Sequence, residues 1–149
     1  RNASAGKVLS IYSVIRSIAS GLNVRIGGHV QFVRPLILPM SEAAAEKSKG
    51  EKLTEAEDEE IKGLSAAVEN YGNFFAQNCF MGSSGTLLIV STLNEIFKSH
   101  NIAQEVTANQ IALNSIPIAV ISVIVGIGYA LWYDRKLKKR FSKKQGGEK

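Results

Sequence analysis

Residues 111–133 read IALNSIPIAVISVIVGIGYALWY, a run of 23 residues without a charged side chain. At a rise of about 1.5 Å per residue, the run forms about 35 Å of helix, enough to cross the ~30 Å hydrocarbon core of a bilayer. Trp132 and Tyr133 lie where interfacial aromatic side chains are expected, and the basic segment DRKLKKR follows directly. The run therefore predicts a transmembrane helix, and the chain is predicted to be an integral membrane protein.

The positive charge of the chain is concentrated behind this run. Residues 134–149 carry eight Lys or Arg and two acidic residues, whereas the whole chain of 149 residues has a net charge of +5. The rest of the chain is therefore close to neutral. A basic segment beside a transmembrane helix favours contact with anionic cytoplasmic lipid, so membrane lipid is an expected partner. Nucleic acid is not expected, because no surface interleaves basic with aromatic residues.

The sequence contains no pattern typical of a catalytic or metal centre. Its single cysteine, Cys79, excludes an intrachain disulfide, and the two histidines lie far apart in the sequence. No nucleophile elbow, phosphate-binding loop or zinc-binding helix motif occurs. We therefore expect no enzyme activity, no bound metal and no cofactor.

Residues 6–24 are predicted to form another membrane helix. Apolar residues recur at helical spacing along one side of it. The opposite side carries small residues, namely Gly6, Ser10, Ser13, Ser17 and Ser20. In a membrane, such a side either allows helices to pack closely or lines a polar cavity, and both interpretations are kept.

Residues 25–41 are predicted to be an interrupted or re-entrant segment. Apolar stretches are divided by Gly27-Gly28, Pro35 and Pro39. Glycine is conformationally free and proline removes a backbone donor, so no single straight spanning helix fits. Irregular backbone at membrane depth is tolerated only where protein or an aqueous cavity covers it.

Residues 42–66 are predicted to be a soluble acidic loop and helix. They contain eight acidic residues and four lysines, and Thr54-x-x-Glu57 predicts a capping box at the start of a helix. Because the acids fall on all sides of that helix, they are interpreted as solvated surface rather than as a catalytic pair or cation site.

Residues 70–97 are predicted to be an interrupted span. No residue from Asn70 to Asn94 is charged, and Gly82-Ser-Ser-Gly85 divides the segment. Ser83 or Ser84 is predicted to cap a half-helix that starts near Thr86. With the basic tail at residues 134–149 in the cytoplasm, the acidic segment is cytoplasmic as well. The fold class is thus a polytopic (multi-pass) all-α membrane bundle of one domain, with interrupted or re-entrant helices and an acidic cytoplasmic segment.

The two interrupted segments are the predicted location of a binding site. Half-helix N-termini carry partial positive charge, which suits a carboxylate, and unwound carbonyls can hold a coupling ion. An arginine at membrane depth is costly and normally faces a partner or a cavity. The candidate substrate-binding residues are Arg34, His29, Asn70, Asn73, Gln77, Ser83, Ser84 and Thr86.

Structural roles are the alternative for each of these residues. Arg25 and Arg34 could reach the interface or pair with Glu42 or Glu69. A hydrogen-bonded structural role is the alternative for His29, and interhelical hydrogen bonds explain the amide side chains equally well.

Two motifs carry a resemblance to a known family. Residues 27–46, GGHVQFVRPLILPMSEAAAE, resemble the signature of a bacterial membrane family that carries a domain-of-unknown-function name, and residues 69–78, ENYGNFFAQN, resemble its second motif. The resemblance covers nearly the whole chain. It implies one subunit of a 5-oxoproline (pyroglutamate) transporter in the bacterial cytoplasmic (inner) membrane, paired with a second, larger membrane subunit. Family members are longer at the N-terminus, so the chain is expected to be a C-terminal part, and the resemblance assigns no residue roles.

Three functional hypotheses follow. The first is a subunit of a secondary transporter that moves a small carboxylate, such as 5-oxoproline, with H+ or Na+. The second is a structural or assembly subunit that stabilises a partner transport protein. The third is a protein with a single span, in which everything before residue 100 is soluble; the uncharged run from Asn70 to Asn94 argues against it.

Overall fold

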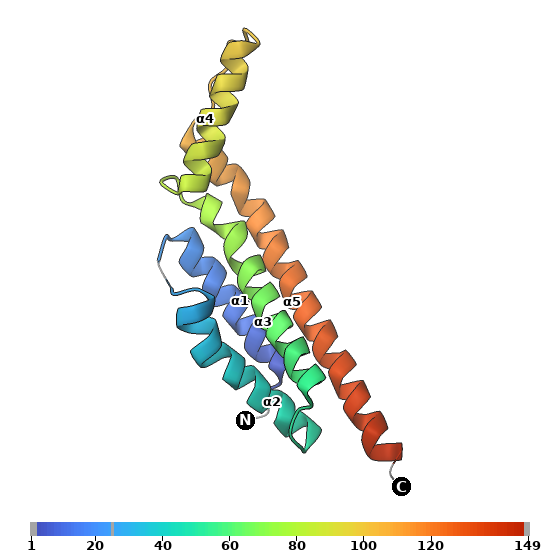
Figure 1. Ribbon diagram of the computed structural model, residues 1–149. Coiled ribbons are helices and arrows are strands. Elements are labelled where there is room, and N and C mark those ends of the chain that lie inside the picture. Colours follow the sequence, from blue (N-terminus) through green and yellow to red (C-terminus); the bar gives the residue numbers. More distant parts are fainter. Residues whose placement is uncertain (1–2, 25, 148–149) are drawn as a thin grey trace.

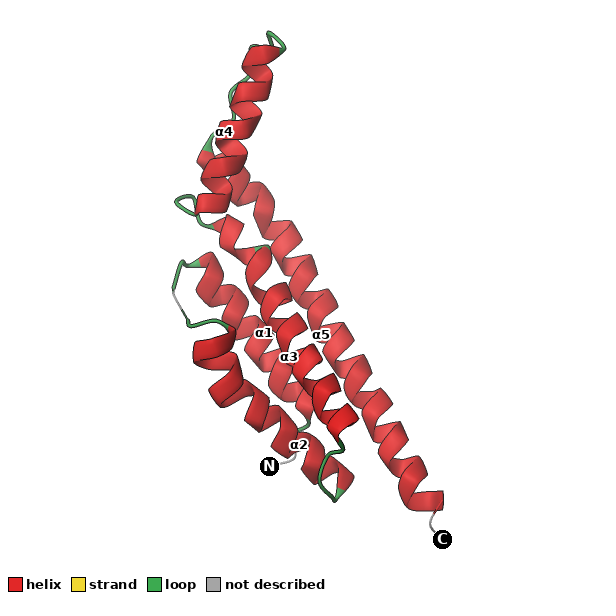
Figure 2. Ribbon diagram, in the orientation of Figure 1, coloured by secondary structure: helices red, strands yellow, loops and turns green. Residues whose placement is uncertain are grey.

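The computed structural model describes residues 3–24 and 26–147, with side chains as far as Ser142. The regular structure in these ranges is helical, in the order α1 (Ala5–Gly21), η1 (His29–Ile37), α2 (Leu38–Lys49), α3 (Glu55–Phe74), η2 (Ala76–Cys79), α4 (Ser84–Ser99) and α5 (Ala108–Gly147). Helices α1, α2, α3 and α5 lie side by side in an elongated bundle, and α4 extends beyond one end of it (Figure 1, Figure 2). The all-α class is thus confirmed for the described residues.

Helix α5 runs along the whole bundle and is antiparallel to both α1 and α3. Its residues 108–142 form the one helix in the described part of the chain that is long and apolar enough to cross a membrane, and an 18-residue window within it has a mean hydropathy of 2.2. Only 22% of that apolar window is buried. Most of its apolar surface therefore faces outward, unlike the core helix of a soluble protein. The multi-pass arrangement stays a prediction, because α1 and α4, with 17 and 16 residues, are shorter than the roughly 20 residues of a typical transmembrane helix.

The basic segment after the apolar run is not a free tail. Helix α5 continues through it to Gly147, and Leu137 and Phe141 are buried against the rest of the bundle. Arg140 donates hydrogen bonds of 2.9 Å to Glu60 on α3. Part of the positive charge is therefore neutralised by the acidic start of α3 rather than directed only toward lipid.

The small-residue side of α1 brings α1, α3 and α5 close together. The hydroxyl of Ser17 donates a hydrogen bond of 2.8 Å to the backbone carbonyl of Gly72. A Cβ on Gly126 of α5 would lie 3.3 Å from the Cβ of Tyr71 and 3.8 Å from Ser13 Oγ. Such separations require small side chains at the contact. The close-packing interpretation of this side therefore holds for Ser13 and Ser17.

The segment predicted to be interrupted begins with a true break and then continues as one helical path. Helix α1 ends in a turn in which Asn23 has a φ of 56° and the Val24 amide bonds the carbonyl of Ala19 at 2.7 Å. Helicity resumes at His29, and η1 runs directly into α2. Neither proline breaks this path. Pro35 lies within the wider π-helical turns of η1, and Pro39 lies in the first turn of α2, directly after the junction of the two helices.

The acidic segment forms a tight helical hairpin of α2 and α3. The predicted capping box is confirmed, because the Thr54 hydroxyl accepts from the Glu57 amide and the Glu57 carboxylate accepts from the Thr54 amide. Lys49, at the end of α2, is buried and lies 2.8 Å from the Glu57 carboxylate. The acidic segment of residues 42–66 thus contains most of α2, the turn after Lys49 and the first part of α3.

The predicted break between α3 and α4 is present. Helix α3 ends at Phe74, η2 tightens the chain, and α4 begins at Ser84. The Ser83 hydroxyl accepts a hydrogen bond of 3.1 Å from the Thr86 amide, so the predicted cap at Ser83 is confirmed.

Candidate functional site

A buried ion pair joins the middle of α1 to α3. Arg16 and Glu69 are 8% and 4% exposed, and Arg16 Nε donates a hydrogen bond of 2.8 Å to Glu69 Oε1. The hydroxyl of Tyr12, one turn earlier on α1, donates to Glu69 Oε2. The Glu69 carboxylate therefore uses both oxygens within the protein. Burial of such a pair is costly unless both charges are well hydrogen-bonded, as they are here.

The hydrogen bonds continue from Arg16 toward a cavity. Arg16 Nη1 donates to Ser20 Oγ at 3.0 Å, and the Ser20 hydroxyl donates to Asn73 Oδ1 at 2.7 Å. With its oxygen occupied in this way, Asn73 keeps its amide nitrogen as a donor. No described residue accepts a hydrogen bond from Arg16 Nη2 or Asn73 Nδ2. These donors are therefore available to a ligand.

The cavity beside these residues has a volume of about 340 Å³. It lies between the end of α1, the loop that follows, the first turn of η1 and the end of α3. Polar residues form most of its lining, with two glycines and two aliphatic residues. The polar residues are Arg16, Ser20, Asn23, Gln31, Asn73 and Gln77, and the others are Gly27, Gly28, Val24 and Ile26. Its size suits a small molecule, and its lining suits a polar one.

The first turn of η1 adds positive potential to this cavity. The first backbone N–H groups of a helix have no carbonyl partner within the helix and carry partial positive charge. Gly27, Gly28 and Gln31 place that turn in the wall of the cavity. A Cβ on Gly28 would lie 3.9 Å from Glu69 Oε1, so the turn also approaches the ion pair. Cationic and N–H donors thus surround one small volume, which favours an anionic ligand.

The residues predicted from the sequence do not all share one site. Asn73 and Gln77 line the polar cavity. His29 and Arg34 instead line a neighbouring groove between η1 and α3, together with Lys62, and the Arg34 side chain is exposed. Asn70 is exposed and lines neither of these two cavities.

Two of the three candidate residues at the start of α4, Ser83 and Thr86, have local structural partners. Ser83 caps the helix, and the Thr86 hydroxyl donates hydrogen bonds of about 3 Å to the carbonyls of Asn78 and Phe80. Thr86 is fully buried and Ser84 is exposed. None of the three lines the polar cavity.

Sequence reasoning missed Arg16, Ser20 in its role as a link to Asn73, and the loop residues before Gly27. One signal for Arg16 was present: it is the one charged residue after Lys7 in the predicted helix of residues 6–24. The proposed partners were also different. Glu69 pairs with Arg16 rather than with Arg34, and Arg25 lies outside the described residues. Glu42, the other candidate partner of the two arginines, forms a hydrogen bond with Asp58. Burial and this hydrogen bond raise the pKa of the Glu42 carboxyl group.

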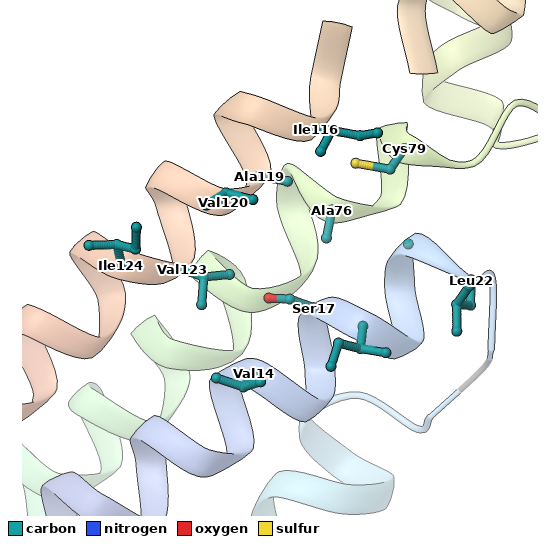
Figure 3. A pocket seen from close by; sticks show the side chains of 12 residues that line it. Val14, Ser17, Leu22, Ala76, Cys79, Ile116, Ala119, Val120, Val123 and Ile124 are labelled. Carbon is teal, nitrogen blue, oxygen red and sulfur yellow. The ribbon is translucent and has the colours of Figure 1, made fainter. Parts of the chain in front are cut away.

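An apolar groove of about 530 Å³ lies on a different side of α1. Figure 3 shows Val14 and Ser17 of α1 on one side of it and Ile116, Val120 and Ile124 of α5 on the other, with Ala76 and Cys79 of η2 between them. Its walls carry almost no polar group. The groove therefore suits an apolar side chain or an acyl chain, not the charged ligand favoured by the polar cavity.

Among the described residues, no group of three or more His, Cys, Asp or Glu side chains is placed to hold a metal ion.

Comparison with known proteins identifies the family of this helical chain. Residues 1–138 match a family described as "Protein of unknown function (DUF969)", and the chain belongs to that family. No curated protein and no solved structure matches the chain.

Proposed function

We propose that this chain is a subunit of a secondary transporter and that its polar cavity binds a small carboxylate, such as 5-oxoproline. The observation that carries the proposal is the buried guanidinium of Arg16 at the wall of a small polar cavity. A guanidinium binds a carboxylate through parallel N–H donors, and Nη2 is available for this. The amides of Asn73 and Gln77 can bond the remaining polar atoms of a lactam ring.

The depth of this site supports transport rather than binding at a surface. Ser122 is the central residue of the apolar run at 111–133, and its hydroxyl donates to the carbonyl of Tyr71, two residues after Glu69. If the run crosses a bilayer, the ion pair lies near its middle. Ionisable groups at that depth are costly and mark substrate or ion pathways. Transporters commonly place their sites there, beside discontinuous helices.

This proposal includes the location and the partners. The bundle lies in the bacterial inner membrane with the end of α5 in the cytoplasm, and it works with a second, larger membrane subunit. The protein binds no nucleic acid and performs no chemical step on its ligand; H+ or Na+ drives the transport.

The assembly role is the second candidate, and the apolar surface of the bundle favours it. Ile11 and Ile18 on α1 are 63% and 58% exposed, and the apolar groove opens beside Ile18. Exposed apolar surface of this extent indicates contact with lipid or with a partner. In that role the chain holds a transport protein in place, and substitutions in the polar cavity leave transport intact.

Uptake of labelled 5-oxoproline by cells distinguishes the two candidates. One set of cells carries this protein together with its larger partner, and two further sets carry either subunit alone. The remaining cells carry both subunits, with Arg16→Ala or Arg34→Ala in this protein. We expect uptake only with both subunits, its loss in Arg16→Ala, and near-normal uptake in Arg34→Ala, whose side chain lies outside the polar cavity. Normal uptake in Arg16→Ala, with the protein present in the membrane, would contradict binding in this cavity.

A further inference from the structure

The Glu69 carboxylate lies beside the cationic group that the proposed function assigns to the ligand. Arg16 holds Glu69 through Nε, while its other end lies at the cavity wall. A bound carboxylate would therefore share one guanidinium with Glu69. Two negative charges would then face one positive charge in a site where Arg16 and Glu69 are nearly inaccessible to water.

Few other groups can compensate for the second negative charge. From α1, the groups that face Glu69 are Tyr12 and Arg16. Tyr12 is neutral and already donates its proton to the hydrogen bond. From the start of η1, Gly28 approaches Glu69. The titratable and charged groups on that side are His29, Arg34 and Lys62, which line the neighbouring groove.

Helix α5 brings no charge to this level of the bundle. It packs there with Ser122, whose hydroxyl bonds the carbonyl of Tyr71, and with Gly126, which faces Tyr71 and Ser13. The η2 side contributes Gln77 to the cavity wall. The one further cation in the adjoining loop, Arg25, lies outside the described residues.

We propose that Glu69 takes up one proton when the cavity binds a carboxylate, so that H+ is the coupling ion. The proposal rests on the proposed function. The proton moves from the aqueous phase to a carboxylate oxygen of Glu69. The Arg16 guanidinium then forms its ion pair with the ligand carboxylate instead of with Glu69. When the ligand leaves, Glu69 releases the proton and the Arg16–Glu69 pair forms again. Protonated Glu69 can still accept a hydrogen bond on its unprotonated oxygen, and its new O–H group can donate to the Tyr12 oxygen, which already lies at hydrogen-bonding distance.

The chain contains a matched control for this role. Glu60, on the same helix, also accepts hydrogen bonds from a tyrosine, Tyr133, and an arginine, Arg140. The side chains of Glu60 and Arg140 are 37% and 44% exposed, and neither lines the polar cavity. Glu60→Gln therefore removes the same type of carboxylate from the same type of partners, but away from the proposed ligand.

The test measures binding of 5-oxoproline to the purified full-length protein between pH 5.5 and 8.5, with proton uptake followed by an indicator dye in weak buffer. In the wild type and in Glu60→Gln, we expect up to one proton per bound ligand and an affinity that falls by up to about tenfold per pH unit on the alkaline side. In Glu69→Gln, we expect no proton uptake and an affinity that changes by less than about twofold over the range.

A second variant keeps the test valid if Glu69→Gln does not fold. Tyr12→Phe retains the carboxylate but removes its hydrogen bond with Tyr12, so the pH dependence of binding is expected to differ from that of the wild type. A purely structural ion pair would lower stability in both variants and leave the pH dependence of binding unchanged.

The outcomes separate the two proposals. Binding to the wild type without proton uptake, or proton uptake unchanged in Glu69→Gln, overturns the role of Glu69 and leaves the proposed cavity intact. Absence of binding by the wild type overturns the proposed function, and the coupling role with it.

Discussion

Arg16 on α1 and Glu69 on α3 lie 2.8 Å apart, Nε to Oε1, in the interior of the bundle, although 53 residues separate them in the sequence. The pair joins the two helices at the depth where α5 presents the centre of its apolar run. One end of the guanidinium bonds Glu69, and the other reaches a polar cavity through Ser20. The same arginine thus links the packing of the bundle to its candidate binding site.

Asn73→Ala is expected to weaken 5-oxoproline binding about 5- to 10-fold. The substitution removes an amide from the cavity wall and leaves the Ser20 hydroxyl without its acceptor, a loss of about 1 kcal/mol. Equilibrium binding with labelled ligand measures the change. Asn70→Ala is the control, because Asn70 has the same side chain on the same helix but is exposed. Equal losses in both variants would contradict this site.

Gly72→Ala and Gly63→Ala are expected to change stability in opposite directions. A Cβ on Gly72 would lie 3.1 Å from the carbonyl oxygen of Ser13 and 3.2 Å from the Cβ of Arg16, so α1 would have to move. We expect a loss of about 1–2 kcal/mol. A Cβ on Gly63 meets no atom within 4 Å, and its helix gains about 0.5–1 kcal/mol from alanine. Thermal unfolding in detergent, followed by circular dichroism, measures both; stabilisation by Gly72→Ala would show that the α1–α3 contact is looser than described.

The hairpin of α2 and α3 is expected to lose stability in acid through Glu57. Burial alone would raise the pKa of this carboxyl, but Lys49 and two hydrogen bonds with Thr54 outweigh burial and lower the pKa to about 2. Because the pKa in the folded state lies below the unfolded value near 4.5, the stabilisation is complete above about pH 4.5 and is lost as pH falls toward 2.

Unfolding temperatures measured from pH 6 to pH 2.5 check this expectation. The wild type should lose more stability over this range than Glu57→Gln, which has no charge to lose. Glu55→Gln serves as the control, since Glu55 is exposed in the same helical turn, and it should follow the wild type. A parallel decline in all three proteins would assign the acid sensitivity to other groups.

The ends of α4 and α2 are expected on opposite sides of the membrane. Ser99 and Lys47 are exposed at these ends, so each accepts a cysteine without loss of packing. In a Cys79→Ser background, a membrane-impermeant maleimide should label Ser99→Cys in intact cells and Lys47→Cys only after permeabilisation. Labelling of both from the same side would rule out the proposed multi-pass topology.

Local features of the sequence were predicted well because their causes are local. The apolar run at 111–133, the capping box at Thr54 and the cap at Ser83 each depend on residues within a few positions of one another. The prediction from the prolines was partly wrong, because its outcome depends on contacts between helices and not on local sequence. Pro35 predicts a break in an α-helix, but a π-helical turn accommodates it, and the choice between the two depends on how η1 packs against α1 and α3.

The sequence by itself determined that this protein has an apolar helix long enough to cross a membrane, followed by a basic segment, and where α3 and α4 begin. Only the tertiary structure decided which polar residues meet. Asn73 and Gln77 were recognisable as one helix face, but their partners Arg16 and Ser20 come from another helix. The rotation and register of α1 against α3 select these contacts, and they are set by close packing at Ser17 and Gly72, far apart in the chain.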